Sequence, residues 1–188
     1  MFKRRHKPTW LSRGRDFFWP RAGWRRSLSY LAHRIRRLPG TPYSIAAGFA
    51  CGAAISFTPL IGLHFALAAL LAWLIGGNLL ASAIGTVVGN PWTFPFIGLW
   101  IYELGNWMLG INGNALPAEV GFTFIFFIFD RPSQVFLPML VGSLPTAFVA
   151  WLASFWPLLG MVEGYQRHRA KRRRVKAAVA RLAQEAGP

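Results

Sequence analysis

Charge is missing from the middle of this chain. Residues 43–102 contain no Lys, Arg, Asp or Glu, although about a quarter of the residues in an ordinary soluble domain are charged. The run is rich in Leu, Ile, Ala, Phe and Trp, and it is far longer than the ~20 residues that cross a bilayer as a helix. This absence excludes an ordinary soluble domain and predicts a membrane-embedded segment.

Cysteine and acidic residues are also scarce. Cys51 is the only cysteine, so it can form no disulfide within the chain and no cysteine-based metal site, and its apolar surroundings predict an inert, buried thiol. The acidic residues of the central part, residues 43–162, are Glu103, Glu119 and Asp130. This number makes a pair of catalytic carboxylates improbable. The chain also has no phosphate-binding glycine loop and no histidine spacing typical of a metal site. We therefore expect no enzymatic activity, no metal and no cofactor.

Positive charge is concentrated at the two ends. Of the 21 Lys and Arg residues, 12 lie in residues 1–42 and eight in 163–188, and the net charge is +15. We divide the chain into a basic aromatic tail (1–42), a membrane domain (43–160) and a basic helix (161–188). Because basic flanks stay on the cytoplasmic side, both termini are expected in the cytoplasm, after an even number of crossings.

The basic tails also carry apolar residues. From about residue 22 to 38 these recur at steps of three and four, which predicts an amphipathic helix, and a second basic helix is expected over 163–186. Aromatic, basic helices lie among lipid headgroups, so anionic lipid is expected as the partner, and nucleic acid is disfavoured. The residues expected to contact headgroups are Trp24, Arg25, Arg26, Arg36, Arg37, Arg172, Arg173 and Arg174.

Two apolar segments of equal length are each broken by a proline turn. Residues 43–75 are interrupted at 58–62, and residues 79–111 at 90–95. Proline removes a backbone donor, and the residue before it avoids helical geometry, so each segment should form two helical halves. In the first segment each half would be roughly 20–22 Å long, short of the ~30 Å hydrocarbon core, which favours a re-entrant hairpin.

A third apolar segment, residues 135–159, is long enough to cross with some tilt, and three prolines should bend it. If the first segment returns to its own side, residues 79–111 cross outward and 135–159 cross back, with 112–134 outside. The apolar patch 122–129 is too short to cross. The sequence thus predicts an all-α integral membrane protein: a short bundle with two broken segments, a C-terminal transmembrane helix and basic amphipathic tails.

The turns carry a resemblance to a known family. The stretches Tyr43–Gly52, Phe57–His64 and Gly85–Thr93, together with Asn78, resemble the bacterial membrane family called domain of unknown function two-zero-six-two. Its pattern is a Pro-x-Gly-x-His turn, an Asn after the next helix and an Asn-Pro-x-Thr turn, and the match covers about residues 40–160. The resemblance implies a multi-pass bacterial inner-membrane protein, and it supplies no activity.

The broken helices are the main candidate for a functional site. Transporters use such breaks to face solutes with helix ends and polar side chains. The alternative is structural, with Asn90 and Thr93 satisfying the break and His64 bonding a carbonyl. Glu103 has the same ambiguity, because a carboxylate at membrane depth is functional by default but can also reach the interface. The candidate pocket residues are Thr58, Pro59, Gly62, His64, Asn78, Asn90, Pro91, Thr93 and Glu103.

Three function classes remain open from the sequence. The favoured one is transport or handling of an anionic or lipid-linked solute at the broken helices, which would require a homo-oligomer because one body of 120 residues encloses little. The alternative is a non-catalytic scaffold or assembly protein whose basic tails bind anionic lipid or a partner. A membrane-embedded enzyme is the third and least favoured class, because the chain lacks the catalytic motifs named above.

Overall fold

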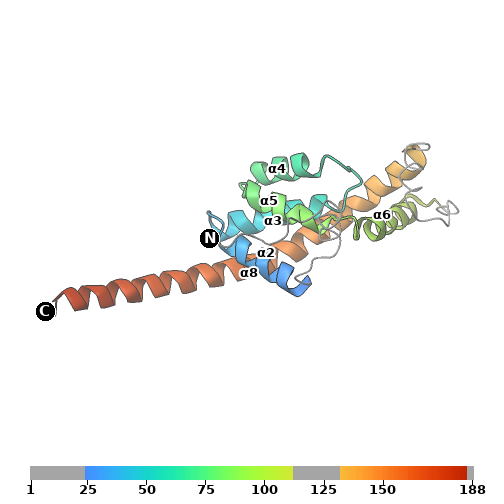
Figure 1. The fold of residues 1–188 in the computed structure, drawn as a ribbon. Helices are drawn as coiled ribbons and strands as arrows, with labels where there is room; N and C mark the ends of the chain where they lie inside the picture. The colour runs from blue at the N-terminus through green and yellow to red at the C-terminus, as the bar shows by residue number, and fades with distance from the viewer. Residues whose placement is uncertain (1–23, 112–131, 186–188) are drawn as a thin grey trace. The chain divides into compact units, whose positions relative to one another are not determined.

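The computed structural model describes residues 24–111 and 132–185, and every regular element in these ranges is helical (Figure 1). The predicted all-α class is confirmed to that extent. The patch 122–129, Glu119 and the first 23 residues lie outside the described residues. The chain divides into two compact units, residues 1–37 and 38–188; the three-part division expected from the sequence stays a prediction.

The first unit contains α2 (Trp24–Arg36), which lies within the helix expected over residues 22–38. Its exposed side chains pair one turn apart: the Arg34 guanidinium donates to the Tyr30 hydroxyl at 3.2 Å, and Nδ1 of His33 lies 2.7 Å from the Ser29 carbonyl oxygen. Such i, i+4 contacts stabilise the helix on its polar side.

In the second unit, α3 (Pro42–Ile55) and α4 (His64–Leu74) fold back on one another. Thr41 caps α3 by accepting from the backbone N–H of Ser44 at 3.1 Å, and Pro42 stands in the first turn, where no donor is needed. The hydroxyl of Tyr43 donates to the carbonyl of Ile75 at 3.2 Å. The start of α3 and the end of α4 therefore lie together, and the first broken segment forms a helical hairpin.

The second broken segment forms α5 (Leu79–Gly85), a 3-10 turn η1 (Thr86–Val88) and α6 (Phe94–Leu109). α3 packs closely on α5 because glycines line their contact. A Cβ atom at Gly52 would collide with the backbone of Ser82, and one at Gly85 with that of Phe49. The absence of these side chains lets the two backbones approach, as small residues do between membrane helices.

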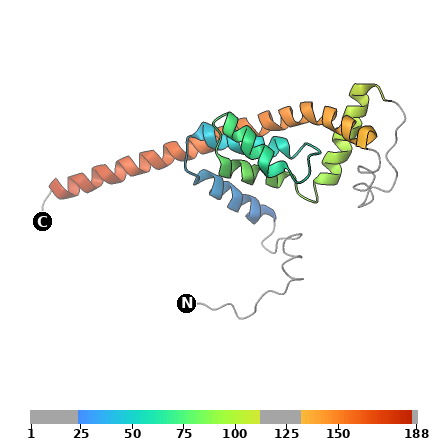
Figure 2. The same cartoon turned by 90° about the horizontal axis from the view of Figure 1, so that it is seen from above.

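α8 corrects the expectation for the C-terminal third. The sequence predicted an apolar segment ending near residue 159 and a separate basic helix, but α8 runs without interruption from Pro132 to Glu185. Each of its internal prolines removes one backbone hydrogen-bond donor, and the helix continues on both sides of each proline. The helix continues through Gly160 and Gly164, and neither has a positive φ. Figures 1 and 2 show the last part of α8 extending beyond the other helices of its unit; we call residues 163–185 the C-terminal arm.

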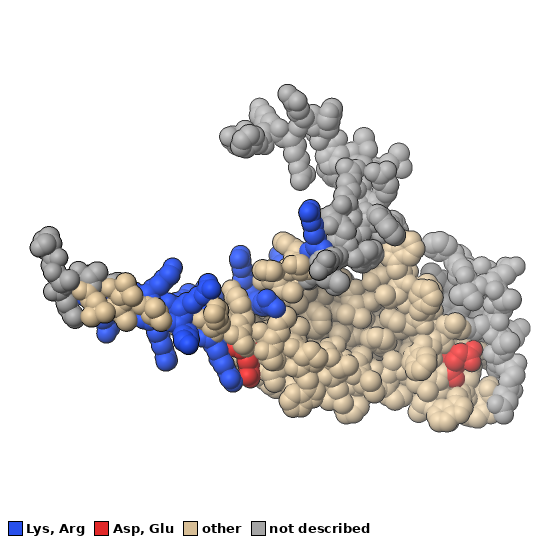
Figure 3. Space-filling model, turned by 90° about the horizontal axis from the view of Figure 1, so that it is seen from below, with Lys and Arg blue, Asp and Glu red and all other residues tan. Residues whose placement is uncertain are grey.

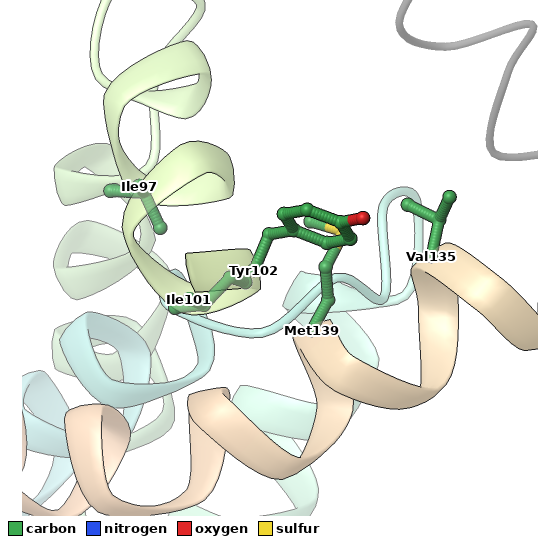
Figure 4. Packing of buried hydrophobic residues seen from close by; sticks show 5 residues of the cluster. All are labelled: Ile97, Ile101, Tyr102, Val135 and Met139. Carbon is green, nitrogen blue, oxygen red and sulfur yellow. The ribbon is translucent and has the colours of Figure 1, made fainter. Parts of the chain in front are cut away.

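Two apolar clusters attach the other helices to α8. In the first, Tyr102 of α6 lies over Met139 of α8, with Ile97, Ile101 and Val135 around them (Figure 4). In the second, the buried alanines of α3 pack against Phe155. Small side chains on α3 and large ones on α8 fill this second contact.

The outer surface of these helices is strongly apolar. Phe96 and Trp107 of α6 are 76% and 78% exposed, and Trp73 of α4 is 69% exposed. One helix of the described part, Gln134–Val179 within α8, is long and apolar enough to cross a membrane. In Figure 3 the basic side chains of this unit gather along the C-terminal arm, and the surface of the body beside it is nearly free of charge.

Candidate functional site

At the first proline turn, the polar side chains form hydrogen bonds with the backbone of the turn itself. The Thr58 hydroxyl donates to the Ile55 carbonyl at 2.8 Å. Nε2 of His64 lies 3.3 Å from the Thr58 carbonyl oxygen, so an imidazole with its hydrogen on Nε2 donates there. Pro59 follows Thr58 and stops α3 from continuing, and Gly62 turns the chain with φ of 91°.

The second turn is a closed network around Asn90 and Thr93. The Asn90 side-chain oxygen accepts from the backbone N–H groups of Trp92 at 2.9 Å and of Thr93 at 3.1 Å. The Thr93 hydroxyl accepts from the Asn90 N–H at 3.0 Å and donates to the Val88 carbonyl at 2.7 Å. Pro91 follows Asn90 and has no backbone N–H to donate. The Asn-Pro-x-Thr sequence therefore replaces the lost helical bonds within six residues.

The two turns pack against each other, and we call them the paired turns (residues 56–64 and 88–94). The buried Ser56 hydroxyl donates to the Gly52 carbonyl at 3.0 Å and lies 3.2 Å from the Thr86 carbonyl oxygen. A Cβ atom at Gly89 would lie 2.9 Å from the Ser56 Cβ, so only glycine fits there. The rings of His64 and Phe94 lie 5.4 Å apart between centroids. Sequence positions thirty residues apart thus meet at one place.

Both α4 and α6 begin at the paired turns, at His64 and Phe94, and no side chain caps either helix at its N-cap residue. Helix N-termini carry partial positive charge, which attracts anions. The side chains of Thr58, Asn90 and Thr93, by contrast, are already bonded to the turn backbone. The arrangement therefore favours the structural interpretation of those three residues.

Asn78 lies away from the paired turns, at the other end of α5. Its side-chain oxygen accepts from the Ala81 N–H at 2.9 Å as an N-cap, and its side-chain amide donates to the Pro39 carbonyl at 2.8 Å. Its own N–H donates to the Ser44 carbonyl at 2.8 Å. Asn78 therefore ties the start of α5 to the start of α3, and it shares no pocket with the turns.

Glu103 is separated from the paired turns as well. It lies nine residues after Phe94 in α6, about 14 Å along the helix axis, and its side chain is exposed. One turn further on, Asn106 is buried, and its side-chain oxygen has no hydrogen-bond partner among the described residues. The nine candidate pocket residues therefore lie in three places rather than one, and only those of the paired turns form a cluster. Whether that cluster binds a solute stays a prediction.

The candidate headgroup-binding residues lie on two helices. Arg172, Arg173 and Arg174 are exposed on the C-terminal arm, and Arg26 and Arg37 are exposed in the first unit. Arg36 is partly buried, and the side chains of Trp24 and Arg25 lie outside what the structure describes. Among the described residues, no three His, Cys, Asp or Glu side chains gather as metal ligands, and the thiol of Cys51 is buried.

Sequence reasoning missed three structurally important residues. Ser56 joins the two turns, and Gly105 and Gly142 let α6 approach α8: a Cβ atom at Gly105 would collide with the Pro138 carbonyl, and one at Gly142 with the Ile101 carbonyl. A signal was available for the glycines, because small residues inside apolar helices mark close helix contacts. Nothing in the sequence indicated which helix each glycine would meet.

The family relationship agrees with this geometry. The profile of a family described as an uncharacterized protein conserved in bacteria (DUF2062) matches residues 25–171. The chain belongs to this family. The DUF2062 match contains both paired turns and confirms the resemblance that the turn motifs carry, and it ends before Arg172. No curated protein and no solved structure matches the chain significantly. The family description names no activity, so the function rests on the geometry.

Proposed function

We propose that this DUF2062 protein is an integral protein of the bacterial inner membrane that acts as a non-catalytic scaffold and presents its basic arm at the cytoplasmic face. The spacing of charge along the body carries the proposal. Gly105 lies against Pro138, so Glu103 lies beside about residue 140 of the antiparallel α8. From there to Glu163, α8 runs for about 35 Å, close to the ~30 Å thickness of a hydrocarbon core.

The surface between these two levels is suited to lipid. α8 carries no charged residue between Pro132 and Val162, and Phe148 and Trp156 on it are 64% and 65% exposed. Soluble monomers rarely expose contiguous apolar surface on this scale, because water contact with it is unfavourable. Acyl chains would cover these side chains without that cost.

The path of the chain within the second unit supports a topology in which the start of α3 and the C-terminal arm lie on one side of the membrane. The bond of Tyr43 to Ile75 and that of Gln166 to the Gly40 carbonyl, at 3.1 Å, place both ends of the α3–α4 hairpin at the arm end of the body. α5 starts at the same end, and α6 continues to the level of Glu103. In a bilayer, α5–α6 and α8 would each cross once and the hairpin would be re-entrant, which keeps the basic residues cytoplasmic.

The scaffold role is favoured over transport by the state of the turn side chains. The side chains of Asn90 and Thr93 form hydrogen bonds within the turn itself. They therefore have little remaining hydrogen-bonding capacity for a solute. The C-terminal arm, by contrast, carries eight Lys and Arg residues against two Glu, and among its described side chains the ion pair is that of Arg167 with Glu163 at 3.0 Å. The largest unneutralised charge of this unit is therefore on the arm.

Handling of an anionic solute at the paired turns is the second candidate. It is favoured by one observation, the convergence of the α4 and α6 N-termini beside His64. Two helix N-termini at one point attract negative charge more strongly than one does.

One experiment separates the two functions. The two variants are expressed in a strain that lacks the gene. If the protein is a scaffold, the variant with the eight Lys and Arg residues of the C-terminal arm changed to Gln should fail to restore the wild-type phenotype, whereas His64→Leu should restore it. Equal membrane levels of both variants, measured by immunoblot, are the control. Restoration by the arm variant together with failure of His64→Leu would contradict the scaffold and favour the solute.

Topology is tested independently with single cysteines in a Cys51→Ala background. A membrane-impermeant maleimide applied to spheroplasts should label position 114 and leave position 177 unlabelled until the cells are lysed. Labelling of 177 in intact spheroplasts would place the arm outside and refute the cytoplasmic assignment.

A further inference from the structure

Helix packing does not explain why two positions of α8 are occupied by glycine. A Cβ atom at Gly160 or Gly164 would meet no atom within 4 Å, whereas in the same helix one at Gly142 would collide with α6. Glycine inside a helix is unfavourable relative to alanine because it gains too much freedom when unfolded. The close approach of α6 explains Gly142, and it leaves Gly160 and Gly164 unexplained as packing residues.

The position of this pair is informative. Gly160 and Gly164 bracket Val162, the last fully buried side chain of α8, and Glu163, its first charged residue. They therefore stand where the apolar part of the helix gives way to the C-terminal arm. Sharp helix bends occur at glycine pairs more readily than in alanine- or leucine-rich turns, so α8 has a ready bending point at this boundary.

The arm beyond the bend has two faces. Val175, Val179 and Leu182 recur at steps of four and three, and they are 55%, 60% and 64% exposed. Around them lie eight Lys and Arg against two Glu. A basic helix with a narrow apolar stripe is suited to the surface of an anionic bilayer, where the stripe enters the acyl boundary and the cations meet phosphate.

In a straight α8, most basic residues of the C-terminal arm would lie too far from the lipid surface to be attracted to it. At 1.5 Å per residue, Arg172 lies about 15 Å beyond Val162 and Arg181 about 28 Å beyond it. Electrostatic attraction to a charged surface fades over about 10 Å at 0.1 M salt. In the straight helix most of the basic residues would therefore be too far away, and the apolar stripe would remain in water.

We propose that α8 bends at Gly160–Gly164 and that the C-terminal arm then docks on the anionic phospholipids of the cytoplasmic face. This inference rests on the proposed membrane topology. Two contacts hold the straight form: the Gln166 side chain donates to the Gly40 carbonyl at 3.1 Å, and Arg167 pairs with Glu163. Both are exposed, where such contacts are weak, so charged lipid competes with them.

The test uses the full chain in nanodiscs that hold one copy each, in a Cys51→Ala background with a fluorophore on a single cysteine. Val179→Cys places it on the apolar stripe, and Ala177→Cys places it on the opposite side of the same turn. Lipids with a headgroup-level nitroxide quench a fluorophore that touches the bilayer. With 30% phosphatidylglycerol we expect quenching at 179 at least threefold stronger than at 177, falling at least twofold in 0.5 M salt.

The bend is tested by adding Gly160→Ala and Gly164→Ala together. These substitutions meet no neighbouring atom and stiffen the helix, so quenching at 179 should fall at least twofold. Equal quenching at 177 and 179, equal quenching in pure phosphatidylcholine, or no effect of the double substitution would each overturn the inference. Loss of the protein from membranes in alkaline carbonate would instead overturn the proposed topology, which separates the two failures.

Discussion

The rings of His64 and Phe94 lie 5.4 Å apart between centroids, and these two residues are the first of α4 and α6. Through this contact and the Ser56–Thr86 bond, two proline turns that are remote in sequence become one structural unit. A helical hairpin and a broken helix are thereby held together at the points where each lacks regular backbone bonds, which is where an apolar environment would penalise them most.

The contact of the paired turns can be tested by crosslinking. In a Cys51→Ala background, His64→Cys with Phe94→Cys should be joined in high yield by a reagent with a span of about 8 Å. The control pair is His64→Cys with Glu103→Cys, whose second site lies about 14 Å further along α6. Equal yields for the two pairs would show that the turns do not meet as described.

The Thr93 hydroxyl should matter for stability. Thr93→Val preserves shape and removes the group that bonds the Asn90 N–H and the Val88 carbonyl, so it should cost about 1–3 kcal/mol in unfolding free energy. Thr93→Ser keeps the hydroxyl and should lose much less. The midpoint of thermal unfolding in nanodiscs compares the two variants; equal midpoints would mean that the network is not structural.

Glycines at helix contacts should differ from those in open space. Gly105→Ala and Gly142→Ala place a methyl group against the backbone of the partner helix, and each should destabilise by about 1–3 kcal/mol. The matched control, Gly160→Ala, meets no atom and should be neutral or stabilising by up to about 1 kcal/mol. Proteolysis during a temperature ramp would rank the three; a destabilised Gly160→Ala would contradict the free position of that residue.

Asn78 should stabilise the protein in two ways, as the N-cap of α5 and through its bond to the Pro39 carbonyl. Asn78→Ala removes the acceptor of the Ala81 N–H and the donor to the Pro39 carbonyl, and the loss of the cap alone should cost about 0.5–2 kcal/mol. Asn78→Asp keeps the cap oxygen and loses only the donor, so its thermal midpoint should fall between those of wild type and Asn78→Ala. A value for Asp equal to that for Ala would show that the Pro39 bond dominates over the cap.

The sequence alone determined the features that depend on neighbouring residues. The charge-free run, the two proline turns and the hairpin follow from composition and from backbone chemistry that acts over a few residues. The bonds of Asn90 and Thr93 belong to this class, since each joins groups at most five residues apart. For the same reason their structural interpretation could be stated from the sequence as an alternative.

Only the tertiary structure decided which parts meet. The sequence grouped Asn78 and Glu103 with the paired turns, but α5 and α6 carry them away along their helix axes, a distance that depends on how the helices pack. It also could not show that α8 continues through Gly160 and Gly164, because glycine adopts helical and left-handed backbone conformations about equally readily, so its presence alone does not decide whether a helix ends. The same contacts distinguish Gly142, which α6 requires, from Gly160 and Gly164, which nothing in the described chain approaches.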